Sequence, residues 1–137
     1  MATNLYEKGL RVGLIGESLL NVTSEQSALK MGSGSLDVFA TPALIAQVEA
    51  AAVSAVDPYL PDGMASVGIE INVRHLSATP IGERVVAMAE ITRIDGKRIT
   101  LEVRAWDERE LIGEGVHVRY LIYADELLER LKRDKQA

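Results

Sequence analysis

Charged residues are almost absent from one stretch in the first half of the chain. Residues 38–56 read VFATPALIAQVEAAAVSAV, and Glu49 is their only charged residue. Alanine, the strongest helix former, dominates the stretch. Thr41 suits the N-cap position and Pro42 the first helical position. The pattern therefore predicts one long apolar helix over about residues 41–57.

After this helix, apolar residues recur with a period of two. Residues 67–77 alternate in the manner of a half-buried strand. Further strands are predicted over residues 16–24, 83–94, 98–107 and 111–123, with a loop or short helix over 25–36 and a short amphipathic helix over 124–135. The order is a strand, the long helix and then four strands in a meander. An α+β fold follows, a single domain over residues 1–137 in which an antiparallel sheet wraps around one central helix.

Glu49 is the first anomaly in this pattern. Residues three, four and seven positions away share its helix face, and all of them are apolar: Pro42, Ile45, Ala46, Ala52, Val53 and Val56. Burying an unpaired carboxylate costs several kcal/mol. Glu49 should therefore have a polar partner, a function, or both.

His75 repeats the anomaly on a strand. It continues the face of Val67, Ile69, Ile71 and Val73, which should pack on the helix. A carboxylate can orient an imidazole or activate water, and the imidazole can transfer the proton. Thr41 adds a hydroxyl at the start of the helix, where free N–H groups favour an oxyanion. Each residue alone is consistent with a purely structural role, but the combination indicates a catalytic site.

Composition excludes several other functions. The net charge is −5 and the basic residues form no cluster beyond KRDK, which argues against nucleic acid. The absence of cysteine excludes disulfides, thiol catalysis and cysteine metal sites, and no metal site is expected from the two histidines. His117 is a second candidate base, with a structural hydrogen-bonding role as its alternative. No signal-peptide core or membrane-spanning run is found, so we expect a soluble cytoplasmic protein.

Three segments resemble a known family. They are VFATPALIAQVEAAA with Thr41 and Glu49, GIEINVRHLSATPIG with His75, and GEGVHVRY near the end. Over about residues 10–131 the chain resembles the fluoroacetyl-CoA thioesterase and its relatives, which use a Thr, Glu and His set at this spacing. The resemblance implies a hot-dog fold, no cofactor, and hydrolysis of a short acyl-CoA thioester by a homodimer, possibly paired into a tetramer, with active sites at the subunit interface.

The resemblance also implies roles for individual residues. His75 would act as general base or proton shuttle, and Glu49 would hold His75 in one tautomer or act on the water. Gly68 and Arg119 match positions that could contact the pantetheine arm of the substrate or shape the site. Thr41 would be a nucleophile or a positioning donor; we favour positioning, because contact with a base cannot be seen in the sequence.

One departure and two alternatives complete the interpretation. The fluoroacetyl-specific enzyme uses phenylalanines over its pocket, whereas EQSALKMGSGSL has no aromatic residue and the chain's only phenylalanine is Phe39. A different acyl preference is therefore expected. The first alternative is a hot-dog hydratase or dehydratase on acyl thioesters, although the Asp and His of such enzymes usually lie close together in one segment. The second is a non-catalytic acyl-CoA-binding module.

Overall fold

The structure is a computed structural model that describes residues 4–135. Its elements are β1 (Ile15–Asn21), η1 (Ser24–Gln26), α1 (Ala28–Met31), α2 (Thr41–Val56), η2 (Asp57–Tyr59), β2 (Met64–His75), β3 (Arg84–Asp95), β4 (Arg98–Trp106), β5 (Leu111–Tyr123) and α3 (Ala124–Lys135). Every predicted helix and strand is present, with bounds close to those expected. The ends of the predicted 1–137 domain, residues 1–3 and 136–137, lie outside the described residues.

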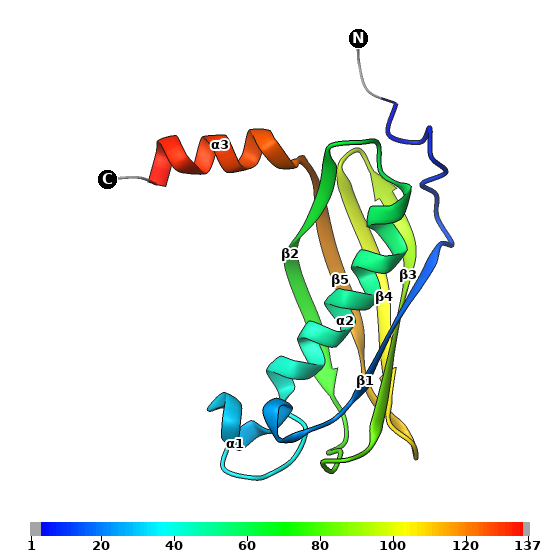
Figure 1. The fold of residues 1–137 in the computed structure, drawn as a ribbon. Coiled ribbons are helices and arrows are strands. Elements are labelled where there is room, and N and C mark those ends of the chain that lie inside the picture. Colours follow the sequence, from blue (N-terminus) through cyan, green and yellow to red (C-terminus); the bar gives the residue numbers. More distant parts are fainter. Residues whose placement is uncertain (1–3, 136–137) are drawn as a thin grey trace.

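The five strands form one antiparallel sheet in the order β1-β3-β4-β5-β2, which curves around α2 (Figure 1). Strands β3, β4 and β5 form the expected meander, and Gly96 turns the first hairpin with a positive φ of 61°. The prediction that β2 belongs to this meander is wrong, because β2 pairs with β5 at the far edge. Helix α2 crosses the sheet diagonally, so the chain returns to the sheet at the edge opposite β1 (Figure 1).

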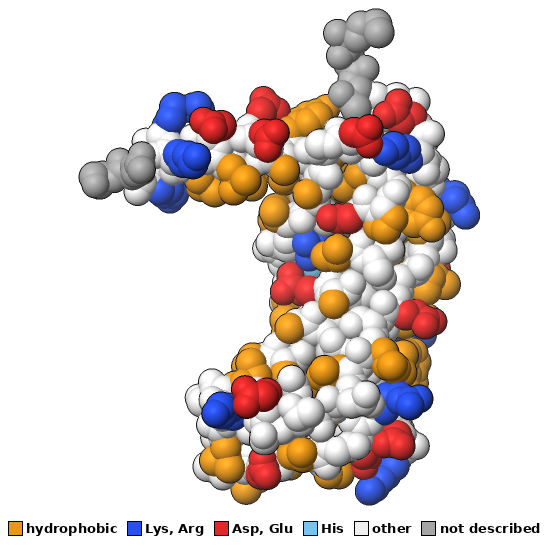
Figure 2. Space-filling model, in the orientation of Figure 1, with side chains coloured by type: hydrophobic (Ala, Val, Ile, Leu, Met, Phe, Trp, Pro, Cys, Tyr) orange, Lys and Arg blue, Asp and Glu red, His pale blue; other side chains and the backbone are white. Residues whose placement is uncertain are grey.

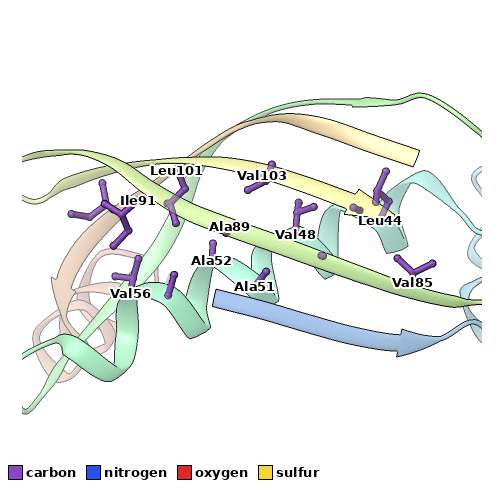
Figure 3. Close-up of a cluster of buried hydrophobic side chains, with 14 of the residues drawn as sticks. Leu44, Val48, Ala51, Ala52, Val56, Val85, Ala89, Ile91, Leu101 and Val103 are labelled. Atoms are coloured by element: carbon purple, nitrogen blue, oxygen red, sulfur yellow. The ribbon is translucent and has the colours of Figure 1, made fainter. Parts of the chain in front are cut away.

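One face of α2 forms the core with the inner face of the sheet (Figure 3). Both the helix and the strands contribute small and branched side chains there: Leu44, Val48, Ala51, Ala52, Val56, Val85, Ala89, Ile91, Leu101 and Val103. Strand β1 passes especially close to the helix. A Cβ on Gly16 would lie 2.2 Å from the Ala51 carbonyl oxygen, so only glycine fits there.

The start of α2 differs from the prediction. Its N-cap is Ala40, which makes no side-chain capping hydrogen bond, and Thr41 is already the first helical residue. The prediction of Thr41 as the N-cap is therefore wrong. Its hydroxyl is left to bond a partner outside the helix.

A β-bulge between Gly68 and Glu70 changes which side chains of β2 face inward. Before the bulge Ser66 is buried, and after it His75 lies on the inner face. A bulge adds one residue to a strand and reverses the alternation of its side chains. The prediction that Ile69 packs on the helix is therefore wrong, and Ile69 is 48% exposed.

Apolar residues remain exposed along one side of the molecule. Val53 on α2 and Ile71 on β2 are exposed, and β2 has no strand beyond it among the described residues. Long edge strands with exposed apolar residues are rare in monomers, because they pair readily with another chain. None of the described helices is long and apolar enough to cross a membrane.

Candidate active site

The first half of the site is a pair between the start of α2 and the end of β2. Thr41 Oγ1 lies 2.8 Å from His75 Nδ1. The ring of Phe39 meets the His75 ring edge-on, with centroids 6.3 Å apart, and limits its rotation. Burial lowers the pKa of His75, and a backbone interaction with Ser77 partly opposes this shift. The neutral imidazole, which has a free lone pair for a proton, is therefore favoured.

This pair lies beside a hollow of about 320 Å³. Its lining contains no Lys, Arg, Asp or Glu and consists of Ala28, Ser33, Val38, Phe39, Thr41, His75, Leu76, Ser77 and Ala78. A small, mostly apolar hollow with three hydroxyls, from Ser33, Thr41 and Ser77, and one imidazole suits a short uncharged group that carries a reactive carbonyl.

The second half of the site is centred on Glu49. Its Oε2 accepts a hydrogen bond of 3.2 Å from Arg119 Nη1 and lies 3.8 Å from His117 Nε2. The Glu49 side chain is 40% exposed, whereas Arg119 and His117 are buried. The prediction that Glu49 lies within a buried apolar stripe is wrong: one side of the carboxylate meets a buried cation, and the other side faces the open flank of α2.

Arg119 is held by a network inside the protein. Its Nε donates to Ser66 Oγ at 2.7 Å, and its Nη2 donates to the Ser66 carbonyl at 2.9 Å. Its Nη1 also donates to His117 Nε2 at 3.1 Å. With the bond to Glu49, these contacts occupy four of the five N–H groups of the guanidinium. Ser66 Oγ donates in turn to Asp57 Oδ1 at 2.6 Å. The geometry thus gives Arg119 an internal role, which is to fix Glu49.

His117, the second candidate base, is held in one protonation state. Its Nδ1 donates to the Glu70 carbonyl at 2.8 Å, so its Nε2 carries the lone pair that accepts from Arg119. Burial and the charge of Arg119 lower the pKa of His117 against the opposing effects of Glu70 and Glu49. Since its only lone pair is occupied and the ring is fully buried, the structural role is favoured over that of a base.

Gly68 makes room for the Glu49 carboxylate. A Cβ at this position would lie 2.5 Å from Glu49 Oε2 and 3.1 Å from His117 Cε1. The backbone of Gly68 does not have the positive φ that would itself require glycine. The requirement is for space beside the carboxylate.

The two halves do not meet within one chain. Thr41 and Glu49 are eight residues apart on one helix, which places them about 12 Å apart along its axis. His75 contacts Thr41, and Glu49 contacts Arg119 and His117. Glu49 therefore does not contact His75 within one chain, and the expected role of Glu49 toward His75 or the water stays a prediction. The sequence interpretation also missed Ser66 and Asp57, because the bulge that turns Ser66 inward leaves no clear signal in the pattern of β2.

Comparison with solved structures identifies the class of fold. A hot-dog-like protein from Thermanaerovibrio acidaminovorans superposes with a TM-score of 0.83 at 24% identity, over 93% of this chain and 95% of its own. A fluoroacetyl-CoA thioesterase superposes with a TM-score of 0.86 at 30% identity, over 92% of this chain and 98% of its own. The fold is therefore the hot-dog fold that the resemblance predicted.

Sequence comparison identifies the family. The model of the family described as fluoroacetyl-CoA-specific thioesterase matches residues 22–125. The fluoroacetyl-CoA thioesterase of Streptantibioticus cattleyicolor is 36% identical over 101 residues, which cover 74% of this chain and 73% of that protein. The chain belongs to the fluoroacetyl-CoA-specific thioesterase family.

Proposed function

We propose that the protein is an acyl-CoA thioesterase that hydrolyses a short acyl-CoA to the free acid and CoA. Membership of a thioesterase family supports the reaction. The observation that carries the proposal is the 2.8 Å contact between Thr41 and His75 beside a small hollow whose lining contains no Lys, Arg, Asp or Glu. This is the arrangement of a nucleophile or water-positioning hydroxyl with its base.

In the proposed mechanism Thr41 is the nucleophile. Its Oγ attacks the thioester carbonyl carbon while its proton passes to His75 Nδ1. The C–S bond then breaks, and the CoA thiolate takes the proton from His75. Water hydrolyses the acyl–Thr41 ester with His75 again as base, which releases the acid and restores the hydroxyl. From the sequence alone we favoured a positioning role for Thr41, because no contact with a base could be seen. The 2.8 Å contact with His75 supplies such a base and supports the role of nucleophile.

Glu49 reaches this pair in the proposal from a second subunit. Two copies would join their β2 edges antiparallel, as suits the exposed apolar residues of this strand. Glu49 lies beside Gly68, and Thr41 lies beside His75. A two-fold axis midway between these pairs exchanges them and brings Glu49 of one chain to the other chain's Thr41 and His75.

The positions of exposed apolar residues support this axis. On α2, the midpoint between Thr41 and Glu49 is Ile45, which is only half buried, and on β2 the midpoint between Gly68 and His75 is Ile71–Asn72. Ile71 is 38% exposed in one chain. The same axis therefore covers both isoleucines. In this dimer Glu49 orients the attacking water or stabilises the imidazolium of His75.

The acyl group and the CoA contacts follow from the lining. Phe39 is buried against His75, and the segment over the hollow contains no other aromatic side chain. We propose a short unsubstituted acyl group in preference to fluoroacetyl. Gly68 shapes the site in this proposal, since the absence of a side chain there leaves room for the Glu49 carboxylate. Arg119 acts on the substrate only indirectly in this proposal, because it holds the Glu49 carboxylate in place.

The test is thiol release from a panel of short acyl-CoAs, including fluoroacetyl-CoA. The protein has no cysteine, so a thiol reagent detects only the CoA product. We expect turnover by the wild type and loss of turnover in His75→Ala and in Glu49→Gln. Rapid quenching should trap an acyl group on Thr41. If no acyl-CoA releases thiol, the proposal is wrong; loss of enoyl absorbance with an enoyl-CoA would then indicate the hydratase, and binding without turnover would indicate the acyl-CoA-binding module.

Mixing the two inactive variants tests whether the site is shared between subunits. A heterodimer of His75→Ala and Glu49→Gln contains one complete site if each site takes His75 from one chain and Glu49 from the other. Random exchange should then restore about one quarter of the wild-type activity, because half of the dimers are mixed and each has one of two sites intact. If each site belonged to one chain, mixing would restore nothing.

A further inference from the structure

Helix α3 stands away from the rest of the protein (Figure 1). It has 12 residues and contains no buried side chain. A helix of this length is marginally stable in water unless an apolar face packs against something. Its apolar residues are Ala124, Leu127, Leu128 and Leu131, and Leu128 is 58% exposed. The helix therefore lacks a packing partner for its apolar face among residues 4–135.

A second exposed apolar surface lies at the opposite end of the molecule. It is formed by residues 28–39, where Leu36 is 66% exposed and Leu29 and Met31 are also exposed. This segment contributes four residues to the lining of the hollow beside Thr41 and His75. Figure 2 shows the molecule as a C, with α3 as one arm and the α1 region as the other.

The strand register decides which surfaces a two-fold axis brings together. Met64 pairs with Tyr123, so α3 leaves the sheet at the Met64 end of β2, while residues 28–39 lie at the His75 end. In the antiparallel dimer of the proposed function, the Met64 end of one β2 lies toward the His75 end of the other. One subunit's α3, about 18 Å long, then reaches the partner subunit's residues 28–39.

Charged residues of both signs accompany the two apolar surfaces. On α3, Lys132 follows Leu131 and Glu129 follows Leu128; on the other surface, Asp37 follows Leu36 and Lys30 follows Leu29. Residues 28–39 thus carry one acid and one base, and α3 carries four of each. Such a pair of surfaces suits a two-fold dimer. The contact between α3 and residues 28–39 then occurs twice, once with each subunit supplying α3.

We propose that α3 of one subunit packs on residues 28–39 of the second copy of this chain and covers the hollow over that copy's Thr41 and His75. The proposal rests on the homodimer of the proposed function. It gives each active site a cover from the subunit that also supplies Glu49. Exclusion of water by such a cover strengthens the electrostatic interactions within the site.

The absence of cysteine provides a direct test. Leu131→Cys and Leu36→Cys are prepared separately, mixed to exchange subunits and treated with a short bismaleimide. Each chain carries one thiol, so a covalent product between the two variants must join different subunits. Ile71→Cys, at the proposed axis, should crosslink with itself and is the control for the dimer. The negative control is a mixture of Leu131→Cys with Leu19→Cys. Leu19 is exposed on β1, at the edge of the sheet opposite β2.

We expect the Leu131–Leu36 mixture to give about tenfold more heterodimeric product than the Leu131–Leu19 mixture, since proximity raises the effective thiol concentration. Equal yields, with Ile71→Cys still crosslinked, would overturn the docking of α3 and leave the dimer standing. A monomeric wild type without any Ile71→Cys product would refute the dimer, and the docking with it.

A second variant tests the covering role. Leu128→Glu with Leu131→Glu changes only exposed side chains, so the subunit should stay folded and dimeric. We expect the KM for acetyl-CoA to rise about tenfold, because the acyl hollow loses its cover. An unchanged KM in a folded dimer would refute the covering role.

Discussion

Replacing Gly68 with alanine adds one methyl group at the point where the strand meets the Glu49 carboxylate. The new Cβ would lie 2.5 Å from Glu49 Oε2, far inside normal contact distance, and 3.4 Å from Arg119 Nη1. The backbone of Gly68 does not need a positive φ, so alanine causes no strain of its own there. The substitution should therefore act by pushing the carboxylate away.

The size of the effect follows from what the carboxylate loses. An added methyl in a packed region costs about 1–3 kcal/mol, but the far end of a half-exposed glutamate can move to relieve much of it. The movement breaks the 3.2 Å bond to Arg119 and changes the direction of Glu49. We expect a stability loss below about 1.5 kcal/mol and a fall in kcat/KM of about 10–100-fold, equivalent to about 1.4–2.7 kcal/mol.

A double-mutant cycle isolates this cause. Acetyl-CoA hydrolysis is measured for wild type, Gly68→Ala, Glu49→Ala and the double variant, and folding is checked by thermal melting. If Gly68→Ala acts only through Glu49, it should have little further effect on kcat/KM once Glu49 is removed. Two additive losses would refute the reasoning and would give Gly68 a separate contact with the substrate.

Four further predictions test other parts of the site. Ser66→Ala removes the acceptor of the Arg119 Nε bond, and it should lower kcat/KM about tenfold with little change in KM; Ser66→Thr, which keeps the hydroxyl, should restore most of the activity. The acid limb of kcat/KM for acetyl-CoA should have a midpoint below 6.5, because burial lowers the pKa of His75 and the neutral base persists to lower pH. Thermal melts should show stability falling as pH drops below 6.5, where the unfolded chain takes up protons that folded His75 and His117 resist. An acid-limb midpoint above 6.5 would contradict the first of these statements, and stability that rises below pH 6.5 would contradict the second. Thr41→Ser should retain acyl-enzyme formation in rapid-quench mass spectrometry, whereas Thr41→Ala should lose about 100-fold or more in kcat.

Much of the fold could be predicted because its signals are local. The alanine-rich stretch defined α2, the Asp95-Gly96 turn defined a hairpin, and the bounds of β5 and α3 matched the pattern of the sequence. The place of β2 in the sheet could not be predicted in this way. It depends on the direction in which α2 crosses the sheet, which is a property of packing rather than of any one segment.

The site was predicted by residue type more than by contact. Thr41 and His75 do meet. The partner of Glu49 was not found from the local pattern, because Arg119 lies 70 residues further along and reaches the carboxylate across two elements. The bulge at Gly68–Glu70 had a similar effect, since one extra residue turned Ser66 inward and Ile69 outward. Interactions between distant segments therefore account for most of the errors.

The Arg119 network fixes the Glu49 carboxylate within its own chain, although in the proposed dimer Glu49 acts at the other subunit's site. Four N–H groups of Arg119 are held by Ser66, His117 and Glu49, and Ser66 is fixed by Asp57, so the carboxylate is aimed before any partner arrives. Groups fixed in advance cost less to order on association and stabilise developing charge without rearrangement. In the proposed dimer, the buried cation keeps Glu49 in place on its own subunit, while the exposed side of the carboxylate faces the other subunit's His75. In that proposed dimer, a buried arginine with no described contact to the hollow contributes to chemistry at a site in the other chain.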